Sequence, residues 1–212
     1  KYPVIFLSLK DANKDNWQDL YSRLKATITD EFLRHKELKK STRLSNTAFY
    51  EKIIAGTGNI TDYATSLLRL SQMLHEHYRQ QPIIIIDEYD TPIQAGYING
   101  FYEQAIQFIR DLFSSALKDN PHIAFGFLTG ILRVAKESIF SGLNNINVNS
   151  LLERRYSDYF GFTTEEVQTM ATYYQADDKM SELQEWYDGY KFGNIASMLT
   201  YMSNKKKNYI SA

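Results

Sequence analysis

The chain has 212 residues, a net charge of −1 and 43% hydrophobic residues, which fits one large domain or one domain with a small appendage. The balanced charge gives no global field of the kind that nucleic-acid binding proteins use. The chain has no cysteine, which excludes a disulfide framework and a thiolate metal site and fits a reducing cytosol. No apolar run approaches the roughly 20 residues of a membrane span, so we expect a cytoplasmic protein without a membrane partner.

The first quarter of the chain predicts a strand and then a helix. Residues 3–9 form an apolar, β-branched run that is typical of a strand. Asp15 or Asn16 is a suitable cap for the helix that follows. We expect the charged stretch from Glu31 to Ser45 to be an exposed helix or loop. The apolar stripe of the helix consists of Trp17, Leu20, Leu24 and Ile28.

The next segment contains a glycine pair that could be mistaken for a phosphate-binding loop. Residues 46–55 look helical and end at Gly56-Thr57-Gly58. No Lys-Ser or Lys-Thr follows at the spacing that a phosphate-binding loop requires, so we interpret the glycines as a turn. A helix is predicted from Thr61, with its leucines directed towards the following strand.

Four consecutive isoleucines, residues 83–86, lie between two prolines and predict the central strand of the sheet. An unbroken apolar, β-branched run is typical of a parallel strand that is buried on both faces. Three acids follow within four residues: Asp87, Glu88 and Asp90. Ligands in open α/β sheets bind at the carboxyl ends of strands, so these acids occupy a position suited to chemistry. The alternative interpretation is a solvated turn after a core strand.

The second half predicts a crossover helix, a third strand and a helical C-terminal region. Residues 102–117 carry an apolar face opposite Arg110 and Asp111, and residues 123–128 form an apolar run that ends in Thr129-Gly130. Strands alternating with helices indicate an α/β domain with a mainly parallel sheet. We expect the isoleucine strand to be central and almost fully buried, between the other two. Helical spacing resumes after Thr163 or Thr164 with Glu166.

The residue types at the strand ends are those of a nucleoside triphosphatase. Asp87 is suited to hold magnesium, and Glu88 to polarise the attacking water. Thr129 could sense a γ-phosphate or position the water. Arg133 could neutralise charge that develops during phosphoryl transfer, although it could equally be a surface charge.

At this point the sequence resembles the bacterial AAA-ATPase-like proteins, P-loop ATPases that often carry a C-terminal nuclease-like domain of the PD-(D/E)xK type. The matching blocks follow the family's order over nearly the whole chain: Tyr2-Pro3-Val4-Ile5, Ile85-Ile86-Asp87-Glu88-Tyr89-Asp90-Thr91-Pro92-Ile93, Thr129-Gly130-Ile131 with Arg133-Val134, Ser138-Ile139-Phe140-Ser141-Gly142-Leu143-Asn144-Asn145, Tyr159-Phe160-Gly161-Phe162-Thr163 with Glu166-Val167, and Trp186-Tyr187-Asp188-Gly189-Tyr190-Lys191-Phe192-Gly193.

The resemblance implies a P-loop NTPase-like three-layer fold over residues 1–160, with a small helical lid or the start of a C-terminal region in residues 161–212. It implies ATP and Mg²⁺ as ligands, Asp87 and Glu88 as Walker B acids, and Thr129 as the sensor position. A nuclease-like domain is then expected in the full-length protein.

Two departures from the family pattern affect this interpretation. No Gly-x-x-x-x-Gly-Lys-Ser/Thr motif occurs in the chain, although the family carries one before the first matching strand. Asn194-Ile195-Ala196-Ser197 stands where the family has an Asn-Pro-Trp-Ser segment. We therefore expect residues to be missing before Lys1 and near Asn194, and the 212 residues alone to be inactive.

Three hypotheses for function remain at this stage. The first is an ATP-binding and ATP-hydrolysing core that acts as a nucleotide-dependent switch. The second is a degenerate, nucleotide-gated interaction module with little turnover. The third is a metal-dependent phosphoesterase built on Asp87, Glu88 and Asp90, which is disfavoured because two-metal sites normally draw acids from further strands.

Overall fold

The computed structural model describes residues 1–44, 47–131, 147, 149 and 162–187. The chain divides into two compact units, residues 1–146 and 147–212, which we describe separately. The boundary expected after residue 160 falls outside the described residues and stays a prediction. In the described part, no helix is both long and apolar enough to cross a membrane.

The first unit is an α/β structure with a parallel sheet. The described elements, in chain order, are β1 (Val4–Ser8), α1 (Trp17–Arg34), the 3₁₀ helix η1 (Lys36–Lys40), α2 (Ala48–Ile54), α3 (Ile60–Ala64), α4 (Ser66–Tyr78), β2 (Ile83–Asp87), α5 (Thr91–Asn99), α6 (Tyr102–Leu117) and β3 (Phe125–Leu128). Strand order is β1-β2-β3, and both pairs are parallel. The prediction that the isoleucine strand is central is confirmed.

Local sequence explains where the helices begin and what they bury. Asn16 caps α1 by accepting the Asp19 N–H at 2.9 Å, as expected from the sequence. Helix α6 has the predicted bounds and buries its apolar stripe, which includes Ile106, Ile109 and Phe113. The glycine pair at residues 56–58 forms a turn, in which Gly56 has a φ of +70°.

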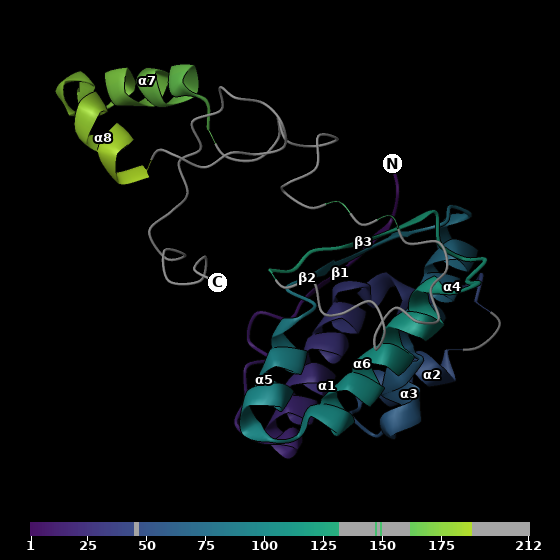
Figure 1. Cartoon of the computed structure of the whole chain (residues 1–212). Helices are drawn as coiled ribbons and strands as arrows, with labels where there is room; N and C mark the ends of the chain where they lie inside the picture. The colour runs from purple at the N-terminus through teal and green to yellow at the C-terminus, as the bar shows by residue number, and fades with distance from the viewer. Residues whose placement is uncertain (45–46, 132–146, 148, 150–161, 188–212) are drawn as a thin grey trace. The chain divides into compact units, whose positions relative to one another are not determined.

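The described α-helices of this unit, α1 to α6, lie on one face of the sheet (Figure 1). Ile5, Leu7, Ile84 and Ile86 point into this helical layer and are almost completely buried. Burial of each of these side chains contributes about 1.5–3 kcal/mol of hydrophobic stabilisation.

The expectation that the isoleucine strand is buried on both faces is wrong. Burial alternates along β2, and Ile83 and Ile85 are only half-buried. In the pleated sheet Ile85 lies in register between Phe6 and Phe127, which are 46% and 51% exposed. Among the described residues, helices cover only one face, so the second covering layer that a three-layer fold requires is not observed there.

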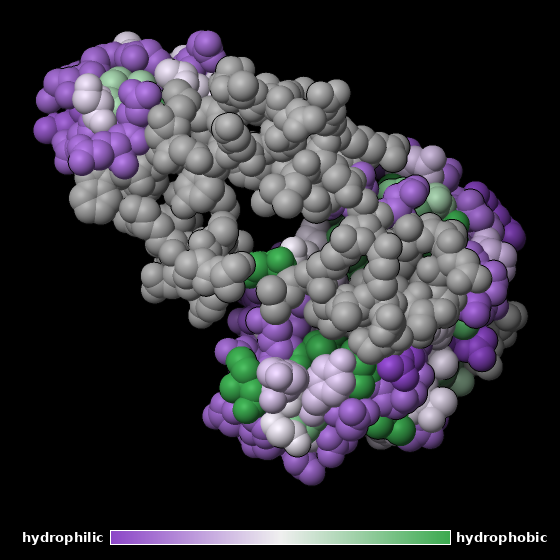
Figure 2. Space-filling view, viewed as in Figure 1, coloured by the Kyte–Doolittle hydropathy of each residue, from purple (hydrophilic) through white to green (hydrophobic). Residues whose placement is uncertain are grey.

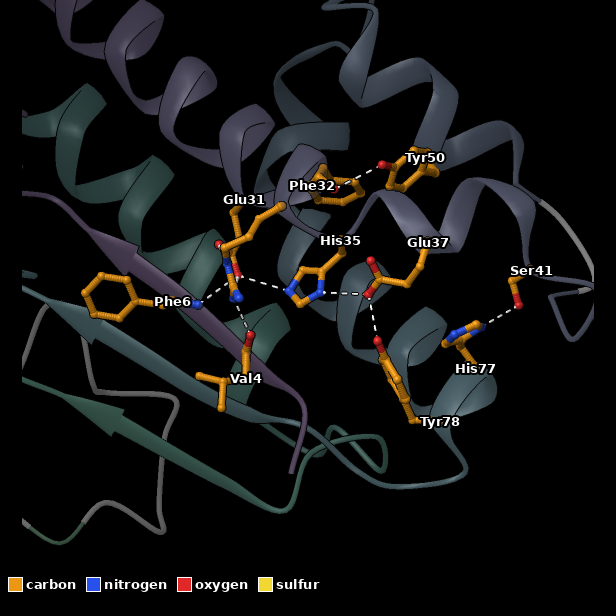
Figure 3. A network of polar contacts seen from close by, with 11 residues as sticks. Val4, Phe6, Glu31, Phe32, His35, Glu37, Ser41, Tyr50, His77 and Tyr78 are labelled. Atoms are coloured by element: carbon orange, nitrogen blue, oxygen red, sulfur yellow. Dashed lines mark hydrogen bonds and ion pairs between the residues drawn. The ribbon is translucent and has the colours of Figure 1, made fainter. Parts of the chain in front are cut away.

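In the described part of the chain, polar side chains rather than another strand bind the outer edge of β1 (Figure 3). Glu31 at the end of α1 accepts the Phe6 N–H at 2.8 Å, and Arg34 donates to the Val4 carbonyl. Arg34 also donates to both oxygens of Glu31, at 2.8 and 2.6 Å. The carboxylate and the guanidinium thus take the acceptor and donor roles of a neighbouring strand, which protects an otherwise reactive edge.

The expectation of an exposed charged stretch after Glu31 is therefore wrong at its start. Glu31 and His35 are 5% and 6% exposed, and Leu38 is fully buried. His35 lies between two carboxylates, with its Nε2 3.3 Å from Glu31 and its Nδ1 3.4 Å from Glu37. Lys36, Lys39 and Lys40 of the same segment are exposed, as expected.

The described part of the second unit is helical. It contains α7 (Thr164–Tyr173), the 3₁₀ helix η3 (Asp177–Lys179) and α8 (Met180–Tyr187). Thr163 and Glu166 form a reciprocal capping box at the start of α7, which confirms the predicted helix start. Residues 188–212 of the expected lid or C-terminal region lie outside the described residues.

Candidate functional site

The candidate site lies at the carboxyl ends of β2 and β3, where two of the predicted residues meet. Asp87 is the last residue of β2, and Thr129 directly follows β3. Because the strands are adjacent and parallel, their carboxyl ends lie side by side, and the two side chains meet there. The Thr129 hydroxyl donates a hydrogen bond to Oδ1 of Asp87. The other oxygen of Asp87, Oδ2, has no hydrogen-bond partner in the part of the chain that the structure describes.

Glu88 occupies a sharp turn between β2 and α5. Its φ is +55°, in the left-handed region that residues with a side chain adopt rarely. The Thr91 N–H donates to the Glu88 carbonyl at 3.1 Å, and the Thr91 hydroxyl lies 3.5 Å from Glu88 Oε2. A strained backbone of this kind persists only where the surroundings enforce it, and it is found preferentially at functional sites.

Asp90, the third acid of the sequence motif, does not join Asp87 and Glu88 in a cluster. It is 1% exposed, and its Oδ2 accepts hydrogen bonds from Gln94 Nε2 at 2.7 Å and from the Ile131 N–H at 3.1 Å. No group of three potential metal ligands occurs among the described residues. Asp90 is thus bound to Gln94 and to the turn after β3, whereas Asp87 is bound to Thr129.

Backbone hydrogen bonds join the turn after β2 to the turn after β3. The Thr129 N–H donates to the Ile86 carbonyl at 2.9 Å, and the Tyr89 N–H donates to the Thr129 carbonyl at 3.0 Å. Tyr89 is buried, and its ring meets Phe113 of α6 edge-on at 6.4 Å between centroids. The candidate residues are thus carried by two mutually bonded turns that rest on the helical layer.

Gly130 permits the close approach of these turns. A Cβ at this position would lie 2.7 Å from Asp90 Oδ1 and 2.7 Å from Tyr89 Cε1. Both neighbours are buried, so neither can move away without displacing others.

We expect Gly130→Ala to destabilise the protein by about 1–3 kcal/mol, because the added methyl group would press against the buried Asp90 and Tyr89. Urea unfolding followed by circular dichroism measures the change. Gly56→Ala is the control, because no atom lies within 4 Å of its added Cβ and only the left-handed backbone is penalised, by about 1 kcal/mol. A Gly130→Ala protein as stable as the parent would contradict this account of the two turns.

Arg133, the remaining predicted site residue, lies outside the described residues. Its role, like the roles of Asp87, Glu88 and Thr129, stays a prediction. The structural role of Asp90 was not predicted from the sequence. The spacing Asp-Glu-x-Asp shows that a third acid follows the strand, but it does not show that this acid is buried.

The comparisons with known proteins agree in part with the sequence pattern. A family model described as "Predicted AAA-ATPase" matches residues 1–140. A curated protein of Azotobacter chroococcum mcd 1, described as an uncharacterized protein in the vnfD 5' region, is 29% identical over 124 residues. The aligned part makes up 58% of this chain and 24% of the relative, so the chain spans about a quarter of that protein. No solved structure matches the chain significantly.

Proposed function

The chain belongs to the predicted AAA-ATPase family, and on this premise we propose that it forms the hydrolytic part of an ATP-dependent switch. The observation that carries the proposal is the hydrogen bond between Thr129 and Asp87 at the carboxyl ends of adjacent parallel strands. Asp87, the Thr129 hydroxyl group and a second acid, Glu88, then lie at the carboxyl ends of the strands. This set fits the binding of a metal–phosphate complex and the orientation of a water molecule.

The donor set around Asp87 fits Mg²⁺ that is held mainly by water and by phosphate oxygens. Magnesium usually keeps several waters and takes one or two protein carboxylates, and Asp87 Oδ2 is available for such a contact. When bound with ATP, the ion would neutralise charge on the phosphate oxygens.

The remaining roles follow from the chemistry of each side chain. Glu88, next to Asp87, would accept a proton from the attacking water and orient it. Thr129 would hold Asp87 in place through its hydroxyl and lie close to the terminal phosphate. Arg133 would supply positive charge during phosphoryl transfer.

The proposal includes elements beyond the described residues. We propose a P-loop NTPase-like fold with a core in residues 1–160 and a helical lid from residue 161. The chain has no Gly-x-x-x-x-Gly-Lys-Ser/Thr motif, so a phosphate-binding loop would come from another part of the full-length protein. A nuclease-like domain would be one partner for the switch to control.

A second candidate function, the nucleotide-gated interaction module, is favoured by exposed apolar surface on the sheet and on α5. The face of the sheet that carries Phe6 and Phe127 is partly exposed and apolar. Figure 2 shows hydrophilic side chains over most of the coloured surface of the helices, interrupted by separate hydrophobic patches, one of them over α5. Tyr97 and Ile98 at the end of α5 are 78% and 75% exposed. Exposed apolar surface of this kind is compatible with protein contacts.

Calorimetric titration with ATP tests the proposal. We expect the full-length protein to bind ATP with micromolar affinity in the presence of magnesium, and the 212-residue chain to bind weakly or not at all. Asp87→Asn should remove most of the magnesium-dependent gain in affinity, because the amide is a poorer ligand for a hard cation.

Asp30→Asn is the matched control, since Asp30 is exposed on α1, away from the strand ends. If the full-length protein does not bind ATP, the proposal is wrong. If Asp87→Asn keeps the magnesium dependence of the parent, Asp87 has no role in holding the metal. Micromolar binding by the 212-residue chain would contradict the account of the phosphate loop.

A further inference from the structure

Asp90 stands at the N-cap of α5 but does not cap that helix. An aspartate at this position usually accepts an N–H from the first turn of its own helix. The Asp90 side chain makes no such bond, although its backbone carbonyl accepts the N–H groups of Ile93 and Gln94 at 3.1 and 3.0 Å. The carboxylate is used elsewhere, and that use requires an explanation.

The carboxylate of Asp90 instead joins α5 to the turn after β3. Its Oδ2 accepts the Ile131 N–H and the Gln94 side-chain N–H, and its Oδ1 lies against Gly130, where a Cβ would be only 2.7 Å away. At 1% exposure, the group is protected from water. A buried carboxylate that accepts N–H groups in a low-dielectric interior makes strong, directional bonds.

The bond from Ile131 to Asp90 adds to other hydrogen bonds between the two turns. These run from the Thr129 N–H to the Ile86 carbonyl, from the Thr129 hydroxyl to Asp87, and from the Tyr89 N–H to the Thr129 carbonyl. Glu88 lies between Asp87 and Tyr89, both of which are tied to Thr129. The left-handed backbone of Glu88 is therefore enforced from both sides, and Asp90 secures the side nearer to α5.

We propose that Asp90 is a positioning residue for ATP hydrolysis: it fixes the Thr129 turn against the Glu88 turn through Ile131 and Gly130. The proposal rests on the proposed function, because it concerns the geometry of that same site. Asp90 itself is 1% exposed, so in this proposal it acts through Ile131 and Gly130 and not directly on the phosphate or the water. Its loss should impair turnover more than nucleotide binding, since a small displacement of an orienting group has a large effect on rate.

The test is the kinetics of Asp90→Asn in the full-length protein. The amide has nearly the same shape, and its oxygen can still accept both N–H groups, but it lacks the charge that strengthens both bonds. We expect kcat to fall at least about tenfold, while the affinity for magnesium-ATP changes by less than about twofold. A merely structural role would instead lower the melting temperature. In that case kcat and the affinity for magnesium-ATP would change by the same factor or not at all.

Asp111→Asn provides a matched control. Asp111 on α6 also accepts hydrogen bonds from a glutamine four residues away, Gln107 Nε2, at 2.9 and 3.0 Å, but it is exposed and lies outside the two turns. This variant should keep the parent's kcat and affinity. If Asp90→Asn melts below the assay temperature, Gln94→Met decides the point, because it removes one donor to Asp90 and should lower kcat about threefold at unchanged affinity.

Glu88→Gln, measured alongside, separates the two possible failures. If Glu88→Gln loses turnover and Asp90→Asn hydrolyses ATP like Asp111→Asn, Asp90 is not a positioning residue and the proposed function stands. If Glu88→Gln hydrolyses ATP like the parent, the proposed function fails, and the role of Asp90 in hydrolysis fails with it.

Discussion

Replacing Glu88 by Gln in the full-length protein is expected to reduce ATP turnover by roughly 10²–10⁴-fold, the loss typical of removing a general base. The amide keeps the volume and hydrogen-bonding reach of the side chain but cannot accept a proton. ATP should still bind with magnesium, because the ion is assigned to Asp87. Steady-state phosphate release, together with nucleotide affinity with and without magnesium, measures both effects.

The control for this prediction is Glu103→Gln. Glu103 is an exposed acid in the first turn of α6, so the same chemical change is made outside the candidate site. It should leave turnover and stability within about 0.5 kcal/mol of the parent, as surface substitutions usually do. Equal hydrolysis by Glu88→Gln and the parent would remove Glu88 from the mechanism and favour the interaction-module hypothesis.

The sequence predicted the parallel sheet well because strand and helix periodicities are local properties. Helix α6 was predicted with its observed bounds, since its apolar residues recur at helical spacing. The four isoleucines predicted a central strand, but they could not report what covers each face of the sheet. Alternate isoleucines face opposite sides, and only the side with Ile84 and Ile86 meets the helices of the described part.

The sequence predicted those residues of the candidate site that directly end or follow a strand. Asp87 and Thr129 follow adjacent parallel strands, and the structure brings their side chains into contact. The left-handed conformation of Glu88 was not predictable, because it follows from hydrogen bonds made by its neighbours to a segment about 40 residues away. The burial of Asp90 depends on the same long-range contacts.

Glu31 shows how tertiary contacts override a charged local sequence. It continues the buried stripe of α1 at helical spacing after Leu24 and Ile28, and this spacing was a signal for its burial. A charge on a buried stripe requires partners, and the partners are distant in sequence: the Phe6 N–H of β1, besides Arg34 and His35. Only the fold reveals that the edge of β1 needs an acceptor at this point.

Glu31→Ala is accordingly expected to be strongly destabilising. It leaves the buried His35 and the part-buried Phe6 N–H without this acceptor, at about 1–3 kcal/mol for each group, so we expect a total loss of about 3 kcal/mol. The contribution of Arg34 is discounted, because its side chain is 49% exposed and can bind water instead. The melting temperature should fall by roughly 6–12 °C. Glu37→Ala is the control. Glu37 is half-buried, lies 3.4 Å from His35 Nδ1 and accepts a hydrogen bond from the Tyr78 hydroxyl, but it does not bind β1. Its loss should cost about 1 kcal/mol.

The pH dependence of stability distinguishes the charge of Glu31 from its shape. Burial is the largest single influence on the Glu31 pKa and raises it, but hydrogen bonds from His35, Arg34 and Phe6 together with the charge of Arg34 outweigh burial, and the pKa lies below 4.5. A lowered pKa in the folded state stabilises the fold fully above the unfolded-state pKa, and this stabilisation is lost as the pH falls through the folded-state pKa. Glu31→Gln does not titrate, so the difference in unfolding free energy between the parent and this variant should shrink as the pH falls below about 4.5. Urea unfolding of both proteins between about pH 3.5 and 7 measures this difference in unfolding free energy. If the difference stays constant across the range, the carboxylate charge does not stabilise the edge of β1.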